Sequence, residues 1–267
     1  MQNAQVCGYC WPENYRQRHE NTTMTINPTA QSPKETSHAN RSKWLLRLLY
    51  LLMGAWVAIV FAFNIFQPIK VLPRVSLSPG FSFINQAGER KTSEDYRGKL
   101  TIYNFTYSHC DTACTQATAQ MESLRTALIQ LGAQEAKFSL VTISLDPERD
   151  TPAVLNTYMS PFLTAPQNDI SWDFLTGDPT RTKYVVGGGF GLYYENVPGE
   201  SGQYAIKFEP RFELVDGWGI VRSEYRGAKL DLALILRDIN YLLAEIHNSQ
   251  GVGRYAYEAA HLFRCYP

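Results

Sequence analysis

The stretch "LTIYNFTYSHCDTACTQATAQMESLRTALIQLG", residues 100–132, decides the fold. Its opening residues, up to Tyr107, are mostly β-branched or aromatic, which predicts a buried strand. After the two cysteines, apolar residues recur at helical spacing up to Gly132, which predicts a helix. Cys110 therefore follows a strand, and Cys114 lies in the first turn of a helix. Their Cα atoms should be about 6 Å apart, which permits a disulfide.

The spacing of Cys110 and Cys114 leaves three interpretations open. The two thiolates can exchange with a disulfide of another protein, or they can hold one Cu(I), a soft ion that prefers thiolate ligands. They can also be two inert buried thiols. The helix N-terminus favours the thiolate form, whereas Asp111 opposes it by repulsion. The adjacent His109 can supply positive charge or accept a proton.

The sequence around this stretch alternates strands with helical patterns, which predicts an α/β fold with a central sheet. Thr151 and Pro152 are typical of a helix N-cap and first position, and an amphipathic pattern at 230–247 predicts a last helix. An antiparallel hairpin at 211–225 makes the sheet mixed. Further strands are expected at residues 137–146, 204–208, 211–216 and 220–225.

Four smaller features receive structural interpretations. A hairpin turn is expected at residues 86–88, followed by a polar loop. The charged run at 146–150 is interpreted as a solvated helix entry that could contact a partner. Tyr193 and Tyr194 are expected to pack on a sheet face. A helix should break at the glycine run 187–189, which lacks the residues of a phosphate-binding loop.

Residues 48–66, "LLYLLMGAWVAIVFAFNIF", contain no charged residue, and about 20 such residues span a bilayer. The segment is longer than the core of a signal peptide and lies behind a long N-terminal segment, so we expect an uncleaved transmembrane helix. The positive-inside rule places the N-terminus in the cytoplasm and the main domain on the extracytoplasmic side of the cell membrane, where disulfides persist. The flanking basic residues are Lys34, Arg41, Lys43 and Arg47 before the span, and Lys70 and Arg74 after it.

The predicted organisation is a cytoplasmic polar tail at 1–43, a transmembrane helix at 44–66, a linker at 67–80, a folded domain at 81–248 and a C-terminal extension at 249–267. The tail carries Cys7 and Cys10, which would need further ligands to hold zinc. Only His19 lies near them, so we interpret them as reduced thiols. The extension reads as a helical docking tail with His261 and Cys265 on one face.

Composition narrows the classes of function. Lys+Arg and Asp+Glu both number 25, so the formal charge is zero and nothing indicates a nucleic-acid partner. Five cysteines are too few for a disulfide scaffold of 267 residues. No Ser–His–Asp arrangement can be proposed from five histidines that lie mostly near the ends of the chain. The chemistry is therefore expected at the cysteine pair.

Three stretches in order, "GKLTIYNFTYSHCDTACTQ", "TISLDPERDTPAVLNTYM" and "WDFLTGDPTRTKYVVGGGFGLYY", resemble the Sco/SenC family over roughly residues 80–245. The resemblance implies a thioredoxin-like fold on a single N-terminal membrane anchor. It also implies a role in maturing the copper centre of cytochrome c oxidase, with copper held by two cysteines and one distant histidine.

Only two of the family's three copper ligands have a matching residue in this chain. The family's cysteines match Cys110 and Cys114, but its histidine falls on Phe208, and no histidine lies between His109 and His247. The family's usual proline after the first cysteine is replaced by Asp111. With two thiolates alone, Cu(I) binding is expected and Cu(II) binding should be weak. His109, Glu209 and His261 are the groups that could complete the ligand set.

Pro210 adds an argument for thiol exchange. It resembles the proline, often cis, that begins the strand facing the dithiol in thioredoxin-like oxidoreductases, although an ordinary strand-edge proline is the alternative. The predicted function is therefore maturation of the oxidase copper centre, as a thiol–disulfide reductant, a Cu(I) carrier or both. The expected partners are the membrane and an oxidase subunit or another copper or thiol protein. A non-catalytic accessory subunit or scaffold of a membrane respiratory complex is the alternative.

Overall fold

The computed structural model describes residues 38–66, 69–110, 112–130, 138–163, 170–199 and 203–263. The chain divides into two compact units, Met1–Val60 and Phe61–Pro267. Helix α1 (His38–Phe66) belongs largely to the first unit. Within α1, Ser42–Ala62 is long and apolar enough to cross a membrane, with a mean hydropathy of 2.1 and no buried residue. Most of the predicted tail, including Cys7, Cys10 and His19, lies outside the described residues.

The second unit is built on a mixed sheet of eight strands, as the alternating pattern predicted. Their order is β1-β10-β9-β4-β5-β6-β2-β3. Strands β4, β5 and β6 are parallel, and the other pairs are antiparallel. The strands are β1 (Ser76–Leu77), β2 (Ser82–Asn85), β3 (Arg90–Thr92), β4 (Leu100–Thr106), β5 (Phe138–Ser144), β6 (Ser171–Thr176), β9 (Arg211–Val215) and β10 (Ile220–Arg226).

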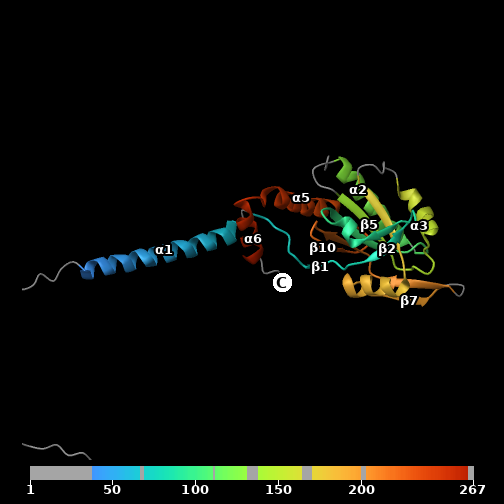
Figure 1. Cartoon of the computed structure of the whole chain (residues 1–267), viewed down its shortest axis with the longest axis horizontal. Coiled ribbons are helices and arrows are strands. Elements are labelled where there is room, and N and C mark those ends of the chain that lie inside the picture. The colour runs from blue at the N-terminus through green and yellow to red at the C-terminus, as the bar shows by residue number, and fades with distance from the viewer. Residues whose placement is uncertain are drawn as a thin grey trace, which may run out of the picture. The chain divides into compact units, whose positions relative to one another are not determined.

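Both faces of this sheet are covered, because β4 is buried along its whole length. Ile102 packs into a cluster with side chains of three helices, α2 (Thr112–Gln130), α3 (Pro152–Met159) and α5 (Leu232–Asn248). Tyr103 and Phe105 point to the other cluster. That cluster is covered by the π-helix η3 (Lys183–Gly189) and a hairpin of β7 (Tyr194–Pro198) and β8 (Tyr204–Phe208). Figure 1 shows these two layers on opposite sides of the sheet.

Local signals explain where the helices begin and end. The Thr151 side chain caps α3, as predicted, and Asp231 caps α5 by accepting hydrogen bonds from two backbone N–H groups. The short helix α4 (Pro179–Thr182) continues as η3 through the glycine run and ends at Gly189. The C-terminal extension contains the expected amphipathic helix, α6 (Gly253–Phe263).

Other details differ from the sequence predictions. No strand was assigned to β1, β6 or β7, and the polar loop after β3 contains the 3₁₀ helix η1 (Ser93–Tyr96). A second 3₁₀ helix, η2 (Ser160–Phe162), follows α3. The prediction for Tyr194 is confirmed because it is buried, whereas the prediction for Tyr193 is wrong because its side chain is 73% exposed. Successive residues of an extended chain point to opposite sides, so only one tyrosine can face the core.

Candidate redox and copper site

The two cysteines of the opening stretch are joined by a disulfide, and their Cα atoms are 5.8 Å apart. Cys110 follows the end of β4, and Cys114 lies in the first turn of α2, as the sequence predicted. Cys114 is only 1% exposed, whereas Cys110 is half-buried. The pair is therefore more open to solvent at Cys110 than at Cys114. The neighbouring Asp111 lies outside the described residues.

A buried carboxylate holds the loop before the disulfide. Asp150, which is fully buried, accepts a hydrogen bond from the backbone N–H of Ser108 at 3.1 Å and another from its hydroxyl. Asp150 also accepts from the Ser144 hydroxyl at 2.5 Å. The interpretation of run 146–150 as a solvated helix entry is wrong for Asp150 and for Asp146, which is 3% exposed. These carboxylates turn inward because the loops at the carboxyl ends of β4 and β5 need acceptors for their donors.

His109 is the exposed member of this loop. Its Nδ1 lies 2.8 Å from the Ser108 hydroxyl oxygen. Because that hydroxyl donates its hydrogen to Asp150, its oxygen is left to accept from a protonated Nδ1. The Nε2 atom of a neutral His109 is then an acceptor on the surface beside Cys110.

The β7–β8 hairpin forms the second wall of the site. The Tyr107 hydroxyl accepts from the backbone N–H of Ile206 at 3.1 Å, and the Arg149 guanidinium stacks 3.8 Å from the ring centroid of Tyr204. Arg149 also donates to the Tyr204 carbonyl at 3.0 Å and pairs with Asp146. These contacts fasten the hairpin to the loops that carry the disulfide, and sequence reasoning missed them because they join segments about 50 to 100 residues apart.

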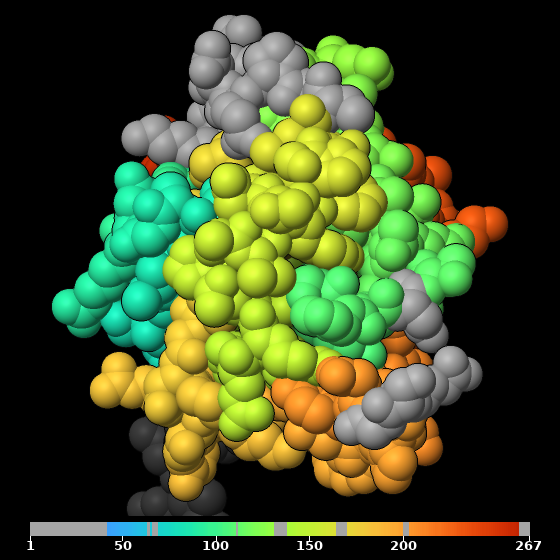
Figure 2. Space-filling view, turned by 90° about the vertical axis from the view of Figure 1, so that its right-hand side faces the viewer, coloured from blue at the N-terminus to red at the C-terminus, as the bar shows by residue number. Residues whose placement is uncertain are grey.

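The phenol of Tyr204 completes this wall. It donates to Asp146 at 2.7 Å. Burial, together with this hydrogen bond, raises the pKa of Tyr204 to about 12. Figure 2 shows the resulting surface, with the green segment around residues 107–116 beside the yellow-green β5–α3 loop and the orange strand β8.

Comparison with known proteins agrees with this architecture. The SCO1/SenC family model matches residues 71–244. The chain belongs to the SCO1/SenC family. Sco proteins are a family of cytochrome c oxidase assembly proteins. A SCO1 protein homolog of Bacillus subtilis is 32% identical over 164 residues, which cover 61% of this chain and 80% of that protein.

Solved Sco structures share the fold. The copper-bound ScoI of Bradyrhizobium japonicum is 30% identical, with a TM-score of 0.50, and the match covers 61% of this chain and 98% of that one. Copper-bound yeast Sco1 is 25% identical, with a TM-score of 0.52, over 68% of this chain and 98% of that one. The domain therefore has the thioredoxin-like fold that the sequence resemblance predicted.

Phe208, the position predicted for the third Sco ligand, lies at the end of β8 and packs against the same hydrophobic cluster as Cys110. Its ring centroid is 6.4 Å from that of Tyr107, the residue whose carbonyl accepts from the Cys110 N–H. Phenylalanine has no atom that can bind a metal. If the Sco ligand position falls on Phe208, this chain therefore presents a hydrocarbon ring there.

Glu209 and Pro210 follow Phe208 in the connection to β9. Glu209 is exposed, and the Pro210 carbonyl accepts from the Gly227 N–H at 2.7 Å. No peptide bond is cis in the part of the chain that the structure describes, so the bond before Pro210 is trans. Pro210 immediately precedes β9, which pairs with β4, the strand that leads to the dithiol.

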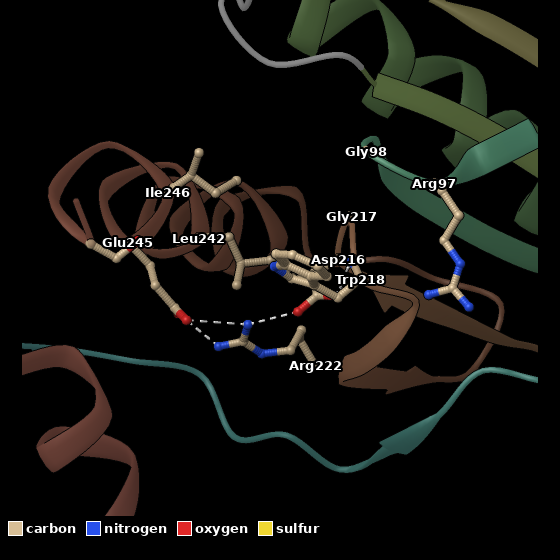
Figure 3. A pocket seen from close by; sticks show the side chains of 10 residues that line it. Arg97, Gly98, Asp216, Gly217, Trp218, Arg222, Leu242, Glu245 and Ile246 are labelled. Atoms are coloured by element: carbon tan, nitrogen blue, oxygen red, sulfur yellow. Dashed lines mark hydrogen bonds and ion pairs between the residues drawn. The ribbon is translucent and has the colours of Figure 1, made fainter. Parts of the chain in front are cut away.

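His261 lies at the other end of the sheet from the disulfide. Its Nε2 is 3.0 Å from Glu245, which pairs with Arg222 at 2.7 Å. Arg222 also pairs with Asp216, just after β9, where that strand lies beside the start of β4. Since Cys110 follows the opposite end of β4, about 20 Å of strand separates His261 from the sulfurs. Figure 3 shows the Arg222 pairs, and Cys265 lies outside the described residues.

Among the described residues, the donor set at the disulfide is thus two sulfurs. Within the described ranges, no group of three His, Cys, Asp or Glu side chains could hold a metal ion. Reduced to thiolates, Cys110 and Cys114 would suit Cu(I), which accepts two soft ligands. The residues around them do not supply the additional nitrogen ligand that Cu(II) prefers, unless His109 turns toward the sulfurs.

Proposed function

We propose that this Sco protein is anchored in the membrane by α1 and acts as a thiol–disulfide reductant in maturing the copper centre of cytochrome c oxidase. The observation that carries the proposal is the Cys110–Cys114 disulfide at a strand–helix junction, with one sulfur-bearing residue half-buried and the other enclosed. Family membership supports the link to the oxidase.

The difference in exposure between the two cysteines supports an order of action in which Cys110 attacks first. In the reduced protein, the Cys110 thiolate attacks one sulfur of the partner's disulfide, and the other partner sulfur leaves as a thiolate. The Cys114 thiolate then attacks Cys110 in the mixed disulfide and releases the second partner thiolate. Two electrons pass to the partner, whose two thiolates take up the two protons given up by Cys110 and Cys114. A separate dithiol reductant must return the protein to its reduced form.

Cu(I) carriage is a second role of the same pair. The copper-bound relatives support it, and two thiolates at the spacing of Cys110 and Cys114 can hold one Cu(I). The hydrocarbon ring of Phe208 argues that Cu(II) is not retained. Thiol exchange and Cu(I) delivery are compatible, because both need the reduced pair and both present it from the Cys110 side.

The location follows from α1 and its flanks. The apolar segment Ser42–Ala62 suits a single span, and the basic residues before it favour a cytoplasmic N-terminus. The domain would then work outside the cytoplasm. A disulfide with an exposed side persists there and is usually reduced in the cytosol.

A trapping experiment tests the exchange. Full-length Cys114→Ser in native membranes should accumulate a mixed disulfide with its partner, because the resolving thiol is gone, while Cys110→Ser should trap none. Oxidase copper content should fall strongly in both variants. Undiminished oxidase assembly with both serine variants would refute the proposal. Full-length reduced protein that binds no Cu(I) would remove the carrier role alone.

A further inference from the structure

The domain has an end that the cysteine chemistry does not use. We call it the α6 end: residues 71–78, the β9–β10 turn at 216–219, the last turns of α5, the connection at 249–252 and helix α6. Arg222 ties it together by donating to the carbonyls of Leu72 and Pro73 at 2.8 and 3.0 Å while pairing with Asp216 and Glu245. Figure 1 shows α6 and α3 at opposite ends of the domain.

Large apolar side chains gather on the surface of the α6 end. Nine are exposed in the described part of residues 69–263, and six of these belong to it. Such clustering on one end marks an interaction surface rather than scattered exposure. The six are Val75 (60%), Leu77 (68%), Trp218 (80%), Ile246 (52%), Val252 (85%) and Tyr255 (77%).

Trp218 lies at a cavity with apolar walls, and the charged residues Asp216, Arg222 and Glu245 line its base. Trp218, Leu242 and Ile246 line a cavity of about 630 Å³, and Arg97 stands at its other side (Figure 3). The charges at the base of the cavity compensate one another, because Arg222 pairs with both Asp216 and Glu245. An occupant therefore needs no buried charge of its own and gains from apolar contact.

The chemistry of the rim suits a phospholipid interface. Tryptophan and tyrosine prefer the headgroup level of a bilayer, and Trp218 and Tyr255 are among the most exposed side chains of the domain. Exposed Lys70, Arg74 and Arg254 surround them, and basic residues are attracted to anionic lipids. Arg74 shares its charge with Glu258 at 3.1 Å, so Lys70 and Arg254 carry most of this attraction.

The length of the chain brings this end near the bilayer. Val71 is 1% exposed and fixed in the α6 end, and it follows Phe66, the last residue of α1, by five residues. Five extended residues span at most about 18 Å. No other part of the domain is held so closely to the apolar helix by covalent connection.

We propose that the α6 end docks on the phospholipid surface, with Trp218 and Tyr255 at headgroup level, so that the disulfide at the opposite end faces away from the bilayer. The proposal rests on the membrane anchoring proposed above. Docking would give the amphipathic helix α6 a role at the membrane surface. It would also explain why Arg222 binds the carbonyls of Leu72 and Pro73, in the segment that follows α1.

Tryptophan quenching by brominated phospholipids tests the docking. The full chain, in bilayer discs of phosphatidylcholine and phosphatidylglycerol, would carry Trp11→Phe, Trp44→Phe and Trp56→Phe, which leaves Trp172 and Trp218. Trp172 is 1% exposed and serves as a baseline. Trp218 emission should fall about twofold, because bromines near the headgroups lie within the depth of interfacial contact. Adding Trp218→Phe should abolish the change.

A matched control uses an exposed residue at the other end of the domain. Asn156→Trp on α3, in the Trp218→Phe background, should not be quenched. Equal emission from Trp218 with and without bromine would overturn docking. Trp218 shielded from soluble acrylamide but not quenched by lipid would indicate a protein occupant and also overturn it. If Trp44 and Trp56 of the parent chain are not quenched either, α1 does not span the bilayer and the proposed anchor is wrong. The trapping of a partner by Cys110 tests thiol exchange separately, because it does not depend on the anchor.

Discussion

The two ends of the central sheet differ in where their polar and apolar side chains lie. At the dithiol end, the reactive bond sits in a wall of aromatic rings, and Asp150 holds the loop that carries it. At the α6 end, the ion pairs of Arg222 are buried and the apolar residues are outside. At the dithiol end, a buried carboxylate holds the loop that carries the cysteines. At the α6 end, Arg222 connects four segments of the chain through ion pairs and hydrogen bonds. Variants at each end should therefore fail differently.

The largest effect is expected at the α6 end. Arg222→Met leaves the buried Asp216 and the half-buried Glu245 without the arginine, and breaking a buried pair typically costs about 3–5 kcal/mol. Burial acts to raise the pKa of Glu245, but hydrogen bonds from His261 and Arg222 outweigh it and lower that pKa, so the carboxylate is charged in the fold. Urea unfolding of the full chain in detergent measures the loss. Arg226→Met, which removes an exposed arginine on the same strand, should change stability little.

A second effect concerns Glu213, on the strand that connects the two ends. Burial raises the pKa of Glu213 to about 8, and its partner Arg211 lies 3.5 Å away. Because the folded-state pKa lies above the unfolded value of 4.5, the stabilisation from the bound proton is fully present below about pH 4.5 and is lost as pH rises through about 8. Wild-type stability should fall over that range by a few kcal/mol, at about 1.4 per pKa unit.

Glu213→Gln should flatten this fall, because glutamine stays neutral. Thermal melts between pH 5 and pH 9, which include the pKa of about 8, would measure the slope. Glu148→Gln, at an exposed position of the loop between β5 and α3, is the matched variant and should keep the steep slope. An unchanged slope in Glu213→Gln would show that the charge at Glu213 does not set it.

A smaller loss is expected at the dithiol end. Asp150→Ala removes the acceptor of the Ser108 N–H, the Ser108 hydroxyl and the Ser144 hydroxyl. Hydrogen bonds to a charged group are worth about 1.5–3 kcal/mol each at most, and water entering the gap recovers part, so about 2 kcal/mol is expected. The rate of partner-disulfide reduction should fall as well. Glu148→Ala, in the same loop but exposed, should leave both measurements unchanged.

The smallest effect is a gain. If position 208 is the family's ligand position, Phe208→His adds a nitrogen ligand to the two sulfurs and should raise Cu(II) affinity at least about tenfold, which is the lower range for groups that tune a metal site. Competition titration with a coloured chelator measures it, and Phe208→Leu controls for the loss of the ring. No increase over Phe208→Leu would mean that Phe208 does not occupy the family's ligand position.

The strands and helices of the core followed from local patterns. Helical spacing predicted α2, and a two-residue cap signal at Thr151 and Pro152 predicted α3. β6 received no strand assignment, and β1 was treated as part of a linker. β1 is only two residues long and is stabilised by pairing with β10, a partner about 145 residues away. Such pairing leaves no periodicity in the sequence of β1 itself.

The sequence by itself determined the dithiol, because Cys110 and Cys114 are four residues apart at a strand–helix junction, and their Cα atoms lie 5.8 Å apart. It also determined the apolar helix and the absence of a histidine between 109 and 247. Only the tertiary structure decided what surrounds the sulfurs: Asp150, Arg149 and Tyr204 come from distant segments. It also separated His261 from the sulfurs. Residues a few positions apart have a relative placement that local secondary structure sets. Neighbours across a sheet depend instead on strand order and register, which the sequence spacing does not show.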